Sequence, residues 1–311
     1  MKAGTIRSAY LAAEGYEAQL AAELARRGAS VAAWHGRLAL SPEPALASAW
    51  ALNVWRDPRM VPIASISDAA ARLRAVQRNW WPYAPVHHRR TMLIAERLPH
   101  VSARPLVFPA APPRTPLGSF TLLAPDLMLA SPDCTSPFPN GEARFVEDRE
   151  GPPSRAYLKL WEALALLRSW PQAGELCLDL GASPGGWSWA LAQLGARVIA
   201  VDKAPLEPRV AALPNVTVRR ESAFGLDPKR WRDGEGPVDW LFSDVVAYPV
   251  RLLRLVRAWI AAGAARRILC TVKFQGRTDH AAAEAFAAIP GAWLRHLSHN
   301  RHELTFAWGF A

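Results

Sequence analysis

The second half of the chain alternates between short apolar runs and helical patterns. Apolar runs predict five strands, at residues 176–180, 197–202, 216–218, 238–244 and 268–273. Apolar residues spaced three or four apart predict helices at 187–194, 250–262 and 279–288. Strands that alternate with helices indicate an α/β fold with a mostly parallel, doubly wound, Rossmann-like sheet. Two last strand patterns, at 292–297 and 303–308, predict an antiparallel edge.

The first half has a less regular pattern. It predicts a strand at 5–12, an amphipathic helix at 16–27, a second strand at 30–40 and further helical pattern over 45–80, with one helix at 67–76. This order indicates a small α+β unit. Five prolines in residues 104–118 exclude a helix there and predict an extended segment or linker. The polar, proline-bearing stretch 147–153 marks a boundary, so we expect two domains, 1–145 and 146–311.

A glycine-rich loop follows the strand at 176–180. The sequence GASPGGW contributes Gly181, Ser183, Pro184, Gly185, Gly186 and Trp187. Glycine suits a backbone that turns tightly and approaches a ligand closely, and a strand, loop and helix in this order are typical of a nucleotide-cofactor site. The spacing is not G-x-G-x-x-G, and Pro184 lacks an amide hydrogen that could bind a pyrophosphate. A cofactor without phosphates is therefore favoured.

Asp202 ends the next predicted strand, about twenty residues beyond Gly181. In a βαβ unit an acid at this place reaches the hydroxyls of a ribose. Loop and acid together predict an adenosine-containing cofactor, and S-adenosylmethionine fits better than NAD. A structural glycine turn beside a surface aspartate is the simpler alternative.

Composition and charge narrow the choice of partner. The chain has 311 residues, of which 50% are hydrophobic, and a formal net charge of +10. Residues 1–150 carry +4 and the remainder +6, so both halves could face a polyanion such as RNA. The three cysteines form no C-x-x-C pair, no metal site is predicted, and no stretch resembles a transmembrane helix or signal peptide. We expect a soluble cytoplasmic protein.

Lysine is rare in this chain. Only five of the 37 basic residues are lysines, and Lys273 ends the apolar run at 268–272. A desolvated lysine can lose its proton near neutral pH, whereas arginine cannot. Lys273 is thus a candidate base at the edge of the sheet where the cofactor would bind. An ordinary lysine at a strand end, reaching toward solvent, is the alternative.

Aromatic and basic residues gather between residues 80 and 90. The segment holds Trp80, Trp81, His87, His88, Arg89 and Arg90. Such a set could stack on bases and contact phosphates. Equally, the tryptophans could be buried beneath an exposed basic turn.

Four separated motifs resemble the FtsJ-like ribose 2′-O-methyltransferases. They are the loop GASPGGWS, the Ser-Asp-Val after residue 242, the Val-Lys at 272–273 and the glutamate of the last strand. Within that family, PSRAYLKLWEA and RHELTFAWG resemble most closely the RlmM type, which methylates a cytidine of 23S ribosomal RNA. The resemblance covers residues 152–311, and TSPFPNGEARF resembles the end of a THUMP domain, so residues 1–145 are expected to be a reduced, THUMP-like RNA-binding region.

The resemblance implies a catalytic tetrad and a methyl donor. The tetrad would be Lys159, Asp244, Lys273 and Glu303, and the donor S-adenosylmethionine. Lys273 would act as the base, Asp244 would orient it, and Lys159 and Glu303 would balance charge and fix the hydroxyl. Asp244 and Ser222 would also line the cofactor site.

The sequence departs from the family at two positions. Ala156 stands where the RlmM type tends to have serine, and Ser222 stands where a carboxylate usually meets the adenine. Ser222 implies a weaker adenine contact, with Glu221 as a possible helper. Two alternatives to a ribosomal RNA methyltransferase stay open: a methyltransferase of another substrate, and an inactive RNA-binding or ribosome assembly factor.

Overall fold

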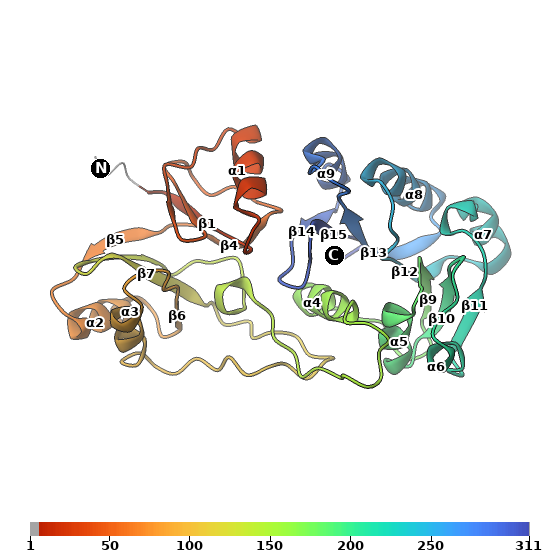
Figure 1. The fold of residues 1–311 in the computed structure, drawn as a ribbon, viewed down its shortest axis with the longest axis horizontal. Helices are drawn as coiled ribbons and strands as arrows, with labels where there is room; N and C mark the ends of the chain where they lie inside the picture. Colours follow the sequence, from red (N-terminus) through yellow and green to blue (C-terminus); the bar gives the residue numbers. More distant parts are fainter. Residues whose placement is uncertain (1–5, 311) are drawn as a thin grey trace. The chain divides into compact units, whose positions relative to one another are not determined.

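The computed structural model describes residues 6–310, which divide by their internal contacts into two units (Figure 1). The first unit comprises 6–105 and 112–144, and the second comprises 106–111 and 145–310. The predicted boundary after residue 145 differs from this division by one residue and by the segment 106–111.

The second unit is built on a seven-stranded sheet. Its strands are β9 (Leu176–Leu180), β10 (Arg197–Val201), β11 (Val216–Arg219), β12 (Val238–Ser243), β13 (Ala265–Lys273), β14 (Trp293–Arg295) and β15 (Glu303–Trp308). Their order in the sheet is β11-β10-β9-β12-β13-β15-β14. The first five are parallel, whereas β15 runs antiparallel to β13 and β14. The strand order reverses at β9, with β10 and β11 on one side and β12 and β13 on the other. Ligands bind at such a switch point, here between β9 and β12, in doubly wound sheets.

Helices cover both faces of this sheet (Figure 1). They are α4 (Tyr157–Leu167), α5 (Gly186–Gln193), α6 (Pro208–Ala211), α7 (Pro228–Glu235), α8 (Pro249–Ala262) and α9 (His280–Ala287). Helix α4 packs against α5, and α8 packs against α7, α9 and β13. The predicted α/β fold with a Rossmann-like sheet is confirmed, as are the seven strands and three helices expected from periodicity, within a few residues at each end. In the part of the chain that the structure describes, no helix is both long and apolar enough to cross a membrane.

Helices α4 and α7 of this unit are not among the three helices expected from periodicity. Helix α4 starts without a side-chain cap, and the residue before its first turn is Ala156. Helix α7 was not predicted because its sequence, PKRWRDGE, is strongly polar. Its signal was the start: the Asp227 side chain accepts hydrogen bonds from the Lys229 and Arg230 amides, and Pro228 opens the first turn.

The first unit contains two four-stranded sheets. One, in the order β2-β3-β1-β4, has β1 (Ser8–Ala12), β2 (Ala33–His35), β3 (Leu38–Ser41) and β4 (Ala51–Trp55). The other, in the order β5-β8-β7-β6, has β5 (Arg59–Pro62), β6 (Trp80–Pro82), β7 (Gly118–Ala124) and β8 (Leu127–Ser131). The helices of the first unit are α1 (Glu17–Arg26), α2 (Ile66–Val76) and α3 (His88–Ala95), and the unit also has a short 3₁₀ turn at Pro139–Gly141.

The α+β character of this unit is confirmed, and so are the helices expected at 16–27 and 67–76. The strand expected at 30–40 is instead the hairpin β2–β3, because Gly36 adopts a positive φ of 58° and reverses the chain. The helical pattern expected over 45–80 was wrong before residue 66, where β4 and β5 lie. Every residue of β4 is buried, so its apolar run lacks the alternation that marks a half-exposed strand. Thr5, the expected start of the first strand, lies outside the described residues.

The proline-rich segment contributes to the second unit. Residue Leu106 bridges to Phe145, and the Phe108 ring stacks on Trp161 of α4, with ring centroids 4.9 Å apart and planes 12° apart. The segment is extended, as predicted, but residues 106–111 are a packed part of the second unit as well as a connection. The sequence pattern gave no sign of this, because prolines report backbone conformation and not packing partners.

Candidate functional site

The sheet topology gathers four charged residues at one edge. Asp244 follows β12 and Lys273 ends β13, and these neighbouring strands are parallel, so their carboxyl ends meet. Glu303 begins β15, which is antiparallel to β13, and it pairs directly with Lys273 in the register. Lys159 comes from α4. All four residues of the predicted tetrad are therefore brought together.

One carboxylate oxygen is the centre of this cluster. Oδ1 of Asp244 accepts a hydrogen bond from Nζ of Lys159 at 3.0 Å and forms an ion pair with Nζ of Lys273 at 3.1 Å. Lys159 also donates to Oε1 of Glu303 at 2.7 Å. The cluster contains two ammonium groups and two carboxylates and is formally neutral, which reduces the cost of holding these charges at a partly buried site.

The two lysines differ in their surroundings. Burial alone would lower the pKa of Lys159, but the carboxylates of Asp244 and Glu303 outweigh burial and raise its pKa above the ordinary value. Lys273 contacts the carboxylate of Asp244, which it shares with Lys159, and the backbone carbonyl of the same residue. Lys159 thus contacts two carboxylates, whereas Lys273 contacts one carboxylate and one carbonyl.

Two polar residues around the tetrad were missed by the sequence analysis. The hydroxyl of Thr271, buried on β13, donates to the same Oδ1 of Asp244. Threonine lies two residues before Lys273, so its side chain is on the same side of the strand. That spacing could have identified Thr271 from the sequence. Its hydroxyl holds the Asp244 carboxylate from a second direction.

Glu162 is the other missed residue, and it lies one helical turn after Lys159. Its buried carboxylate accepts hydrogen bonds from the backbone amides of Ser298 and His299, from the Ser298 hydroxyl and from Nδ1 of His299, at 2.6–3.0 Å. Ser298 and His299 belong to the connection between β14 and β15. Glu162 therefore ties the helix that carries Lys159 to the loop that leads into Glu303.

The glycine loop has the conformation its sequence predicts. Gly181 and Gly185 have φ values of 79° and 113°, which disfavour any other residue. A Cβ on Gly181 would lie 2.7 Å from Cα of Val245, the residue that follows Asp244. The loop and the tetrad are thus adjacent. Trp187 is buried, and its indole donates to the Ala156 carbonyl at 2.9 Å, so this predicted cofactor residue joins the starts of α4 and α5.

Asp202 and Ser222 follow the ends of β10 and β11, beside this loop. The Asp202 carboxylate accepts the amides of Ser183 and Ala204, at 3.0 and 2.8 Å. Each carboxylate oxygen can accept a second hydrogen bond, so Asp202 retains capacity for ligand hydroxyls. Ser222 is half-buried just before a 3₁₀ turn, and the Ser183 hydroxyl donates to the Pro205 carbonyl at 2.8 Å.

Asp179, on β9 immediately before the loop, is a further buried acid. Its Oδ2 accepts the Ser188 hydroxyl at 2.6 Å, whereas among residues 6–310 no donor pairs with Oδ1. The pKa of Asp179 is raised to about 7, and burial is the largest cause. The Ser188 hydrogen bond lowers this pKa, whereas the charges of Asp244 and Asp202 contribute to the rise. A buried oxygen without a partner in the protein is a candidate contact for a ligand or a water molecule.

The aromatic and basic segment of the first unit is split by the fold. Trp80 lies in a core with Leu73, Ile94 and Phe120, and its indole donates to the Leu73 carbonyl at 2.9 Å. Of the two alternatives left open by the sequence, burial holds for Trp80, because β6 turns its side chain toward α2. Trp81 is half-buried, His87, His88 and Arg89 are exposed, and Arg90 is half-buried.

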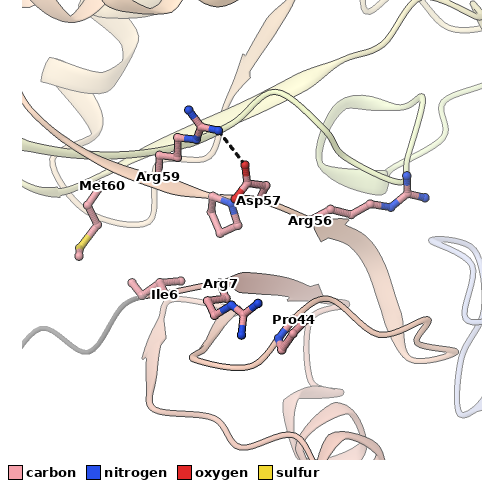
Figure 2. A pocket seen from close by; sticks show the side chains of 8 residues that line it. Ile6, Arg7, Pro44, Arg56, Asp57, Arg59 and Met60 are labelled. Carbon is pink, nitrogen blue, oxygen red and sulfur yellow. Dashed lines mark hydrogen bonds and ion pairs between the residues drawn. The ribbon is translucent and has the colours of Figure 1, made fainter.

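Figure 2 shows a pocket in the first unit. It has a volume of about 520 Å³ and is lined by Ile6, Arg7, Pro44 and residues 56–60. Arg59 pairs with Asp57 at 3.1 Å, and Arg56 and Arg7 stand beside the apolar walls (Figure 2). No residue predicted from the sequence lies in this pocket, because its arginines come from separate segments.

The chain is similar to one protein family and to several proteins of the same name. Residues 152–274 match the model of the FtsJ-like methyltransferase family. A protein named ribosomal RNA large subunit methyltransferase M from Aromatoleum aromaticum is 36% identical over 195 residues, which are 58% of this chain and 51% of the relative. One of the same name from Methylococcus capsulatus is 30% identical over 269 residues, 80% of this chain and 74% of the relative.

The chain spans about half the length of the first curated relatives it matches. Among solved structures, a putative hemolysin from Lactococcus lactis matches with a TM-score of 0.39 and 18% identity, covering 52% of this chain and 90% of the other. The family match begins at residue 152, so the THUMP-like character expected for residues 1–145 stays a prediction.

Proposed function

The chain belongs to the ribosomal RNA large subunit methyltransferase M family, and from this premise we propose that it methylates a ribose 2′-hydroxyl of ribosomal RNA. The observation that carries the proposal is the tetrad, in which one oxygen of Asp244 binds both Lys159 and Lys273 beside the glycine loop. A cytidine of the large-subunit RNA is the specific target we propose. The reaction needs a methyl donor, an aligned hydroxyl and a group that removes its proton.

S-adenosylmethionine fits the residues at the switch point of the sheet. We propose that the loop from Gly181 to Gly186 lies against the cofactor, that Asp202 accepts the ribose hydroxyls and that Ser222 meets the adenine. The unpaired Oδ1 of Asp179 supports a bound donor such as an ammonium group, because that buried oxygen has no partner among the described residues. When bound, the cofactor supplies an electrophilic methyl group.

The tetrad then performs proton transfer and orientation. Neutral Lys273 would accept the proton of the 2′-hydroxyl as the oxygen forms its bond to the methyl carbon and the carbon–sulfur bond breaks. Asp244 holds the Lys273 amine in line. Lys159, kept cationic between Asp244 and Glu303, would stabilise the negative charge that develops on the ribose oxygen. Correct alignment contributes several kcal/mol to lowering the barrier.

RNA binding is proposed for both units. The net charge of +10 supports attraction to phosphates, and binding should weaken steeply with salt as counterions are released. In the first unit, Trp80 is unavailable, but exposed His87, His88 and Arg89 and the arginines of the pocket in Figure 2 supply basic groups. Site selection among many identical hydroxyls requires such contacts outside the reaction centre.

The test is to map 2′-O-methylation across ribosomal RNA in cells with and without this protein. We expect one cytidine of the large-subunit RNA to lose its methyl group, and purified protein to restore it with S-adenosylmethionine. Lys273→Arg protein should not restore it. Full methylation in the absence of the protein would contradict the proposal, and RNA binding without methyl transfer would favour an assembly factor.

A further inference from the structure

An exposed apolar face lies directly beside the tetrad. Val246, Tyr248 and Val250 are 72%, 66% and 46% exposed, whereas Ala247 and Pro249 between them are buried. The segment thus alternates, and its three exposed side chains form what we call the 246–250 face. Of the ten large hydrophobic side chains exposed within residues 6–310, three are in this stretch of five residues.

The position of this face ties it to the reaction centre. It begins two residues after Asp244, and the intervening Val245 packs closely against Gly181 of the cofactor loop. The backbone carbonyl of Tyr248 accepts the amides of Arg251 and Leu252, at 3.0 and 3.2 Å, at the start of α8. The Tyr248 ring therefore projects from a backbone that is fixed by a helix of 14 residues.

Positive charge continues from this face along α8. Arg251, Arg254 and Arg257 are exposed and follow one another at intervals of three residues. The Arg251 guanidinium lies over the Phe224 ring, 3.9 Å from its centroid, and so is held near the strand end that carries Ser222. Apolar rings beside arginines are the combination that single-stranded RNA binds, through stacked bases and paired phosphates.

We propose that the 246–250 face is a base-stacking subsite: Tyr248 stacks on an unpaired base of the RNA at or next to the methylated nucleotide, and α8 arginines contact its phosphates. This rests on the proposed function and names residues that select the nucleotide. The base of the methylated nucleotide is joined to the reacting ribose by one glycosidic bond, so a surface beside the tetrad is within reach of that base or of a neighbouring one. An apolar protein partner would leave the adjoining arginines without acidic groups to bind.

The test compares Tyr248→Ala with Tyr248→Phe, which retains an aromatic ring. Tyr248→Ala should raise the KM for ribosomal RNA about tenfold, the effect expected from losing one stacked base. Tyr248→Phe should stay within about twofold of wild type, and calorimetry should find unchanged S-adenosylmethionine affinity in both. Val246→Ala should raise KM, unlike Val107→Ala, a matched control in which the side chain is 70% exposed.

A double-mutant cycle identifies the stacked base. RNA lacking the base of the methylated nucleotide, or of a neighbour, is assayed with wild type and Tyr248→Ala. The loss caused by Tyr248→Ala should disappear on the RNA that lacks the stacked base. If the wild-type protein transfers methyl groups to RNA and Tyr248→Ala has an unchanged KM, the stacking subsite is overturned while the proposed function stands. The same holds if the rise in KM caused by Tyr248→Ala persists on every abasic RNA. Wild-type protein that transfers no methyl group to RNA overturns both proposals.

Discussion

The tetrad and the segment from Trp80 to Arg90 are two candidate sites with opposite outcomes. The fold brings the tetrad residues together and separates the residues of the segment. The tetrad residues are spread over 145 positions, from Lys159 to Glu303, yet bonds of 2.7–3.1 Å connect them. The other candidates are within eleven positions, yet Trp80 is buried in a core while His87, His88 and Arg89 face solvent. Closeness in sequence therefore did not produce a common surface.

The difference has a topological cause. Parallel strands of one sheet all deliver their carboxyl ends to the same edge, so residues that follow or end such strands meet wherever they stand in the chain. Asp244 and Lys273 are of this kind, and β15 adds Glu303 because it runs the opposite way. In β6 successive side chains alternate between faces, so Trp80 and Trp81 point in opposite directions.

The sharpest test of the tetrad is Lys273→Arg. Arginine retains the charge beside Asp244 but cannot release its proton near neutral pH. Methyl transfer to RNA should fall about a thousandfold, equivalent to about 4 kcal/mol of transition-state stabilisation, while S-adenosylmethionine affinity persists. Tritiated methyl transfer and calorimetry provide the two measurements. Lys203→Arg, at an exposed lysine of the same unit, is the matched control, and near wild-type transfer by Lys273→Arg would show that another group is the base.

The same contrast explains what the sequence could predict. The order and type of the strands in the second unit followed from periodicity. Lys273 was predicted from its place at a strand end, whereas Lys159, Asp244 and Glu303 came from the family resemblance. Glu162 and Asp179 were not predicted as site residues, because both are marked by burial, which the sequence does not show. The partner of Glu162, Ser298, is also 136 residues away in the chain. In the first unit β4 was missed because a fully buried strand shows no alternation. Packing of Phe108 on Trp161 left no periodic signal.

Trp80→Ala tests the other side of the comparison. Removing a buried tryptophan should lower the free energy of unfolding by about 3 kcal/mol, with the Leu73 carbonyl losing its indole donor. Trp81→Ala, at the half-buried neighbour, should cost less than half of this. Chemical denaturation measures both, and equal losses would show that the two rings have equivalent surroundings.

Asp179 extends the contrast to buried charge. Because burial raises the pKa of Asp179 to about 7, the folded state keeps a proton that the unfolded state has released between about pH 4 and pH 7. Stability from this group is therefore full below about pH 4 and falls as pH rises, by about 1.4 kcal/mol per pH unit, until about pH 7. In Asp179→Asn this contribution should vanish, so the variant gains stability relative to wild type across that range. Urea titrations at each pH measure it, with Asp233→Asn as an exposed control; parallel curves for Asp179→Asn and wild type would refute the buried-proton account.

The smallest predicted effect concerns the proline-rich segment, where closeness in space again had no sequence signal. Phe108 stacks on Trp161, which lies on the helix that carries Lys159, with centroids 4.9 Å apart. Phe108→Ala should lower the free energy of unfolding of the second unit by about 1 kcal/mol, the size of an offset-stacked aromatic pair. Val107→Ala next to it, at an exposed side chain, should have no measurable effect. Lys159 is two residues from Trp161, so a loss of methyl transfer by Phe108→Ala under conditions in which the variant is fully folded would show that the segment also positions the tetrad. Equal free energies of unfolding for Phe108→Ala and Val107→Ala would mean that the stacking contributes nothing to stability.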